Sequence, residues 1–131
     1  MKRSDVRRYF KNGRAVIAPE TFAIVKTKRA LVNALAIIKD ERETTCVIDE
    51  SKLGSQKFLG FEGGWRMITF DMVLPLSLVG FFAAVSGALA DAGVNIFTVS
   101  AYTTDHVFVK DQKLGTAIAA LEKLGMTVRR P

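Results

Sequence analysis

Alternating apolar and polar positions predict a β-strand over residues 65–73. Ile68 and Phe70 are apolar, whereas their neighbours Thr69 and Asp71 are polar. A period of two residues is typical of a strand that buries one face. Sequence pattern alone therefore places the start of an ordered unit near the middle of the chain.

The period changes to three and four residues after this strand, which predicts an amphipathic helix over residues 78–92. Ser77 is a residue type that caps helix starts, and Gly93 is one that ends helices. The apolar stripe of this helix consists of Leu78, Phe82, Val85, Leu89 and Ala92.

Two further strands are expected after this helix. Asn95–Ser100 reads as a short buried strand, residues 102–104 as a turn, and Asp105–Lys110 as a strand with Val107 and Val109 on one face. Strands separated by so short a polar turn form a β-hairpin.

The C-terminal part predicts one more helix and one more strand. Asp111 is placed to cap the helix, Gly125 to end it, and Met126–Arg129 to form an edge strand. Its apolar stripe is Leu114, Ala117, Ile118, Leu121 and Leu124. The order is then βαββαβ, and right-handed crossovers place both helices on one face of a four-stranded antiparallel sheet. We expect an α+β protein with a ferredoxin-like sandwich.

Three strands are expected in the first half: Thr21–Lys26, Leu35–Lys39 and Glu43–Asp49. Residues 46–54 resemble residues 107–115, and both segments end in Lys-Leu-Gly. An internal duplication explains this similarity, and so does chance combined with the common strand-to-helix pattern.

The space between Lys26 and Leu35 is too short for a full helix, so a first copy would be abbreviated. We expect a basic N-terminal segment over 1–20, an abbreviated half with its linker over 21–64, and a complete domain over 65–131.

Positive charge is concentrated near the N-terminus. The chain of 131 residues has a formal net charge of +6, and residues 1–30 hold nine Lys or Arg against two acids. Such a segment can neutralise phosphates, although basic termini are commonly solvated and frayed. We therefore keep nucleic-acid binding through this basic segment as the second of two hypotheses about function; the first depends on the C-terminal half and is given below.

The cysteine count and the hydropathy pattern argue against a disulfide-bonded, a zinc-binding or a membrane-spanning protein. Cys46 is the single cysteine and His106 the single histidine, so neither an internal disulfide nor a structural zinc site is expected. The longest apolar stretch, 78–92, contains polar residues and falls short of a membrane span. We expect a cytoplasmic protein without membrane association, metal or cofactor.

Several segments together resemble the ACT domain family. They are Gly64-Trp-Arg, residues 75–80 (Pro-Leu-Ser-Leu-Val-Gly), residues 89–100 (LADAGVNIFTVS) and residues 104–110 (TDHVFVK). More narrowly, the chain looks like small proteins with two ACT-like halves that are related to the ACT pairs of the cytosolic arginine sensor. The family usually has an acidic residue and Pro-Gly before the first helix, whereas here the glycine is displaced to Gly80.

The resemblance implies a non-catalytic regulatory or sensor module that binds a small effector, commonly an amino acid, where two ACT units meet. It also implies a homodimer that completes its sites. An amino acid presents a carboxylate and an ammonium group, and a helix start offers unpaired N–H groups to the carboxylate. The predicted ligand-binding residues are Ser77, Leu78, Val79, Ser100, Thr103, Thr104 and Asp105, with Asp105 facing the ammonium group.

These polar residues also have a purely structural interpretation, in which Ser77 caps the helix and Asp105 and the threonines stabilise a turn. His106 is expected to lie on a strand surface, because its neighbour Asp105 points to the other face. Cys46 is expected to be a packed thiol. A small acyl-phosphate hydrolase is disfavoured, because residues 73–79 contain no arginine.

Overall fold

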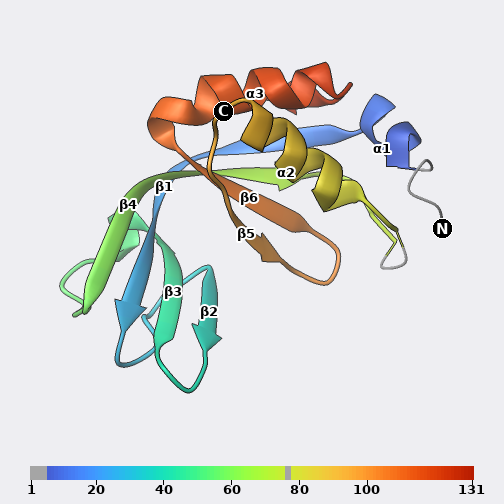
Figure 1. The fold of residues 1–131 in the computed structure, drawn as a ribbon. Helices are drawn as coiled ribbons and strands as arrows, with labels where there is room; N and C mark the ends of the chain where they lie inside the picture. Colours follow the sequence, from blue (N-terminus) through green and yellow to red (C-terminus); the bar gives the residue numbers. More distant parts are fainter. Residues whose placement is uncertain (1–5, 76–77) are drawn as a thin grey trace.

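A computed structural model describes residues 6–75 and 78–131 and shows an α+β fold (Figure 1). Its helices and strands are α1 (Arg7–Lys11), β1 (Arg14–Thr27), β2 (Ala36–Lys39), β3 (Thr44–Asp49), η2 (Glu50–Lys52), β4 (Gly60–Phe70), α2 (Phe81–Asp91), β5 (Phe97–Ser100), β6 (Asp105–Lys110), η3 (Asp111–Lys113), α3 (Leu114–Lys123) and β7 (Thr127–Arg129). The strands form one sheet in the order β2-β3-β1-β4-β6-β5, and β7 pairs with β1. The helices α2 and α3 cover the same face of the sheet.

The sheet differs from the predicted four-stranded sandwich because β1 takes part in it. Strand β7 runs parallel to the start of β1, with Arg14 paired to Thr127, and β1 is antiparallel to β4, with Ile17 paired to Ile68. The first strand therefore lies between β4 and β7, which a plain ferredoxin-like sandwich would place side by side. Ala15 and Ile17 are fully or almost fully buried in the core below the helices, so burial favours this insertion.

From residue 6 onward the N-terminal segment is folded, although basic termini are commonly solvated and frayed. Val6 and Phe10 are buried, and the Phe10 ring stacks on Phe81 with centroids 5.1 Å apart. The helix α1 thus buries Phe10 and exposes Arg7 and Arg8. Part of the N-terminal positive charge therefore lies on the exposed side of an ordered helix.

Helix α2 begins at Phe81, three residues later than predicted. Its N-cap is Gly80 with φ of 91°, a left-handed conformation that favours glycine. Leu78 precedes the helix but still packs against the core. The predicted cap Ser77 lies outside the described residues.

The end of α2 agrees with the prediction. Gly93 has φ of 77°, its N–H donates to the Ala90 carbonyl at 3.0 Å, and the Val94 N–H donates to Leu89 at 2.9 Å. These two bonds form a Schellman motif, which satisfies carbonyl groups at the helix end.

Asp111 does not cap α3 as predicted. It begins the short 3-10 helix η3, whereas α3 starts at Leu114 and has no side-chain cap. The Asp111 carboxylate instead accepts a hydrogen bond from Arg66 at 3.0 Å. A tertiary partner has therefore replaced the local capping interaction.

The two halves of the sheet have matching register. Phe22 and Trp65 occupy equivalent positions, because Phe22 pairs with Asp49 of β3 and Trp65 pairs with Lys110 of β6. Phe22 and Trp65 also pair with each other across β1 and β4. Each half continues into a 3-10 helix, and each adds an edge strand, β2 or β5. This arrangement supports the internal duplication. In the first half, the segments 28–35 and 53–59 stand at the positions that α2 and α3 occupy in the second half.

The sheet separates two sets of buried side chains in the second half. Ile68, Phe70 and Val107 lie under the helices, whereas Trp65 and Phe108 lie on the opposite face with Phe22 of the first half. Within the described residues, no helix is both long and apolar enough to cross a membrane.

Candidate ligand-binding site

The start of α2 offers backbone N–H groups at the surface. Gly80 supplies no capping side chain, and its carbonyl accepts the first helical bond, from the Ala84 N–H at 3.0 Å. The N–H groups of the first helical turn have no intrahelical partner, and the helix dipole places positive potential there. Val79, directly before this turn, is 48% exposed. The segment can therefore receive an anion through its backbone.

The tip of the β5–β6 hairpin holds the predicted polar residues. Ser100 pairs with Asp105 at the last position of the ladder. The Ala101 N–H donates to the Thr104 carbonyl at 2.7 Å, which closes the turn. Thr104 and Asp105 are half-buried, whereas Ser100 and Thr103 are exposed. The tip thus combines an accessible carboxylate with several hydroxyl groups.

Phe70 links the hairpin to the helix start. It pairs with Asp105 across β4 and β6, so both side chains lie on the helix-covered face of the sheet. Its ring packs edge-on against the ring of Phe81, the first residue of α2, with centroids 5.2 Å apart. One side chain therefore has Asp105 beside it and the helix start above it.

His106 lies on the face opposite Asp105, as expected. Its Nδ1 is 2.8 Å from the Thr69 Oγ1, across the β4–β6 pair. Burial lowers the pKa of His106 below its usual value, and the Asp105 carboxylate raises that pKa by a smaller amount. The histidine is therefore a neutral strand residue in the folded protein near neutral pH.

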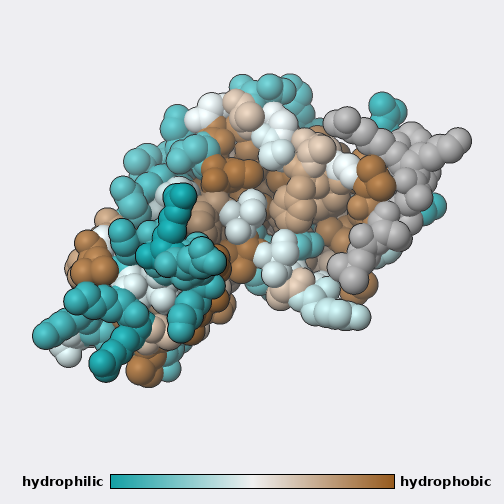
Figure 2. Space-filling model, turned by 60° about the horizontal axis from the view of Figure 1, so that its bottom comes forward, coloured by the Kyte–Doolittle hydropathy of each residue, from teal (hydrophilic) through white to brown (hydrophobic). Residues whose placement is uncertain are grey.

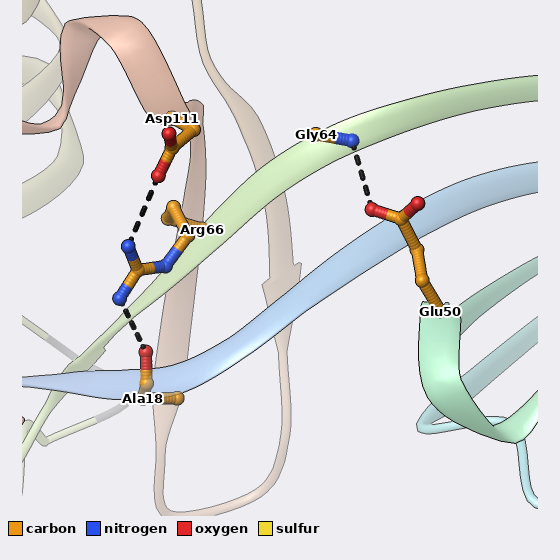
Figure 3. Close-up of polar contacts among 5 residues, drawn as sticks. All are labelled: Ala18, Glu50, Gly64, Arg66 and Asp111. Carbon is orange, nitrogen blue, oxygen red and sulfur yellow. Dashed lines mark hydrogen bonds and ion pairs between the residues drawn. The ribbon is translucent and has the colours of Figure 1, made fainter.

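Sequence reasoning missed a polar cluster where the two halves meet (Figure 3). Arg66 donates to Asp111 at 3.0 Å and to the Ala18 carbonyl at 3.1 Å, which connects β4 to η3 and β1. Glu50 accepts the Gly64 N–H at 3.1 Å. Glu50 and Asp111 occupy the same position of the duplicated segment, so the repeat was the one available signal.

A second basic residue, Lys110, lies next to this cluster. Its ammonium group lies 4.7 Å from the centre of the Trp65 ring, 3.2 Å from Glu62 and 2.6 Å from the Gly63 carbonyl. In these contacts the charge of Lys110 on β6 is bound by groups of β4, so the contacts hold the two strands together. We assign the cluster a structural role.

The remaining candidate reactive groups are possible metal ligands and the single cysteine. Among the described residues, no three His, Cys, Asp or Glu side chains are grouped so that they could hold a metal ion. Cys46 is fully buried, and its sulfur accepts the Leu31 N–H at 3.5 Å. It is the packed thiol that the sequence predicted.

Solved structures with a similar fold cover nearly the whole chain. A protein from Agobacterium tumefaciens has a TM-score of 0.79 at 19% identity, covering 92% of this chain and 94% of its own. A Vibrio cholerae protein of unknown function, described as a possible transport protein, has a TM-score of 0.77 at 19% identity, covering 93% and 97%. The regulatory subunit of aspartate kinase from Thermus thermophilus has a TM-score of 0.62 at 12% identity, covering 86% and 95%.

Sequence comparison assigns the family. Among curated proteins, none matches the sequence. The sequence model of the ACT domain matches residues 60–123, which run from the start of β4 to the end of α3. The predicted resemblance to the ACT domain is therefore confirmed, and residues 60–123 belong to the ACT domain family.

Proposed function

We propose that the protein is a non-catalytic regulatory module that binds a free amino acid between the start of α2 and the β5–β6 hairpin. The match of residues 60–123 to the ACT domain supports a regulatory, ligand-binding role. The observation that carries the location is the position of Phe70, which pairs with Asp105 and packs against the first residue of α2.

The two ends of an amino acid fit the two parts of this site. Its carboxylate accepts hydrogen bonds from the N–H groups around Gly80 and Phe81, because the N-cap residue Gly80 has no side chain that could bond to them. Its ammonium group faces Asp105, and Ser100 and Thr104 supply further hydrogen-bonding groups. Leu78, Val79 and Thr103 complete the proposed site. The similar fold of an aspartate kinase regulatory subunit makes amino acids the first ligands to test.

Thermal unfolding with each common amino acid tests the proposal. A ligand at 100 times its dissociation constant adds about 2.7 kcal/mol to the free energy of unfolding. The midpoint of a domain of this size then rises by about 10 °C. Failure of every amino acid to raise the midpoint would reject the proposed ligand class.

Asp105→Ala locates the site. We expect this variant to unfold at nearly the same temperature as the parent without ligand and to lose the ligand-induced rise. Asp91→Ala is the matched control, since Asp91 is an exposed acid at the opposite end of α2. An undiminished response of Asp105→Ala would remove Asp105 from the site. The predicted homodimer belongs to the same proposal. Analytical ultracentrifugation with and without ligand measures whether the protein is a monomer or a dimer.

Nucleic-acid binding is the outcome that we do not expect. Basic α1 packs on the core through Phe10, and Arg14 lies 3.6 Å from Asp71. Binding of an oligonucleotide that weakens steeply with added salt would favour that alternative.

A further inference from the structure

Two surface hollows occupy matching places in the two halves of the molecule. The first, here called the basic hollow, has a volume of about 640 Å³ and is lined by residues 28–31 and 56–59. The second has a volume of about 560 Å³ and lies between α2 and α3. Segment 28–31 follows β1 as α2 follows β4, and segment 56–59 follows η2 as α3 follows η3. The basic hollow therefore lies between the segments that replace the two helices.

The charges around the two hollows differ. Lys28, Arg29 and Lys57 line the basic hollow, and no acidic residue does. Within the part of the chain that the structure describes, none of these three cations has an acidic side chain within 4.0 Å. The other hollow is lined by one acid, Asp91, and one base, Lys123. Of the two hollows, only the basic hollow is therefore lined by basic residues with no acidic residue among them.

Apolar groups lie beside these cations. Leu31 is buried at the wall, whereas Phe58 is 46% exposed and Leu59 is 60% exposed. The Phe58 ring contacts the Phe61 ring, with centroids 5.5 Å apart. Figure 2 shows hydrophobic residues next to strongly hydrophilic ones at its lower left, where the β2–β3 part lies.

Polar contacts join the walls of the basic hollow. The Gln56 side chain accepts the Val32 N–H at 2.6 Å and donates to the Val32 carbonyl at 3.1 Å. The Leu59 N–H donates to the Lys26 carbonyl at 2.7 Å. These bonds fix the two loops relative to each other, so the hollow is largely formed before any ligand arrives. A preformed hollow loses less conformational freedom on binding.

We propose that the basic hollow binds an organic anion with an apolar body. The anionic group lies among Lys28, Arg29 and Lys57, and the body covers Phe58 and Leu59. The volume of the basic hollow is within the range of about 300 to 1,000 Å³ that is usual for small-molecule sites. This site is separate from the one at α2, because it belongs to the other half of the molecule.

The test compares 4-phenylbutyrate with the uncharged 4-phenylbutan-1-ol, which has the same apolar body. Amide chemical shifts of the full chain are followed by NMR during each titration. We expect the carboxylate to shift the amides of residues 28–31 and 56–59, and the alcohol to bind about tenfold more weakly. The double variant Arg29→Gln with Lys57→Gln is expected to weaken the carboxylate to the level of the alcohol.

Lys123→Gln is the matched control, since it removes a cation from the other hollow, and it is expected to leave the affinity unchanged. The proposal is overturned if the alcohol binds as well as the carboxylate, if the double variant keeps its affinity, or if millimolar carboxylate leaves these amides unshifted. Asp105→Ala is expected to retain this binding, which separates the outcome from that of the amino-acid site.

Discussion

His106 couples the stability of the β4–β6 pair to pH. Its pKa in the folded protein lies below the usual value of about 6.5, because burial disfavours the charged ring. Between the two pKa values the unfolded chain binds more protons than the folded one. The free energy of unfolding therefore rises with pH in that window.

We expect the stabilising contribution of His106 to be complete above about pH 6.5 and to disappear as the pH falls through the lower, folded value. Urea unfolding at several pH values measures this dependence. His106→Gln keeps a side chain that can bond to Thr69 without a titrating ring, so its stability is expected to vary less across the window. Equal slopes for the parent and the variant would exclude His106 as the source.

Glycine has opposite effects within α2 and directly after its C-terminal end. Gly93 adopts φ of 77° at the end of the helix, where a β-carbon is strained. Gly87 lies within the helix, and a β-carbon added there meets no atom within 4 Å. Substitution by alanine therefore tests two arguments about the backbone: the strain of a left-handed residue at position 93 and the helix-weakening effect of glycine at position 87.

We expect Gly93→Ala to destabilise the protein by about 1 to 2 kcal/mol and Gly87→Ala to stabilise it by about 0.5 to 1 kcal/mol. Denaturant unfolding of the two variants gives the sign directly. A destabilised Gly87→Ala would indicate that the α2 surface is less open than the structure shows, and a neutral Gly93→Ala would argue against the Schellman motif.

The local pattern was sufficient for elements whose ends and faces are set by near neighbours. The strand Asp105–Lys110 and the glycine ends of both helices were predicted from spacing alone. The start of α2 was not, because Leu78 continues the apolar stripe and packs on the core without being helical. Asp111 was wrongly predicted to cap α3, because the local pattern could not show its actual partner, Arg66, which is 45 residues away in the sequence.

For the candidate site, the sequence could name polar groups near a helix start and a turn. It could not show that Phe70 connects them, because that requires the β4–β6 register and the Phe70–Phe81 contact. The basic hollow was missed altogether. Its two walls are 25 residues or more apart in the sequence, and neither contains a motif.

At the scale of the whole molecule, β1 and β4 prevent the two halves from being independent. Each strand contributes to both: β1 pairs with β3 in the first half and with β7 after α3, and β4 pairs with β6 as well as β1. β1 also crosses the predicted boundary at residue 20, and β4 crosses the one at residue 64. A division of the chain at these positions would cut through paired strands.

A fragment of residues 60–131, which contains the whole segment matched to the ACT domain, is therefore expected not to fold alone. It lacks Ala15, Ile17 and Phe10, which fill the core below α2 and α3, and it leaves β7 without a neighbouring strand. Loss of one buried aromatic side chain alone costs about 3 to 5 kcal/mol, a large part of the stability of a typical domain. Circular dichroism and NMR dispersion of the fragment measure the result. Adding the fragment 1–59 is expected to restore the folded spectrum, because it returns β1 to its place between β4 and β7, whereas a fragment that folds without it would show that the second half is self-sufficient.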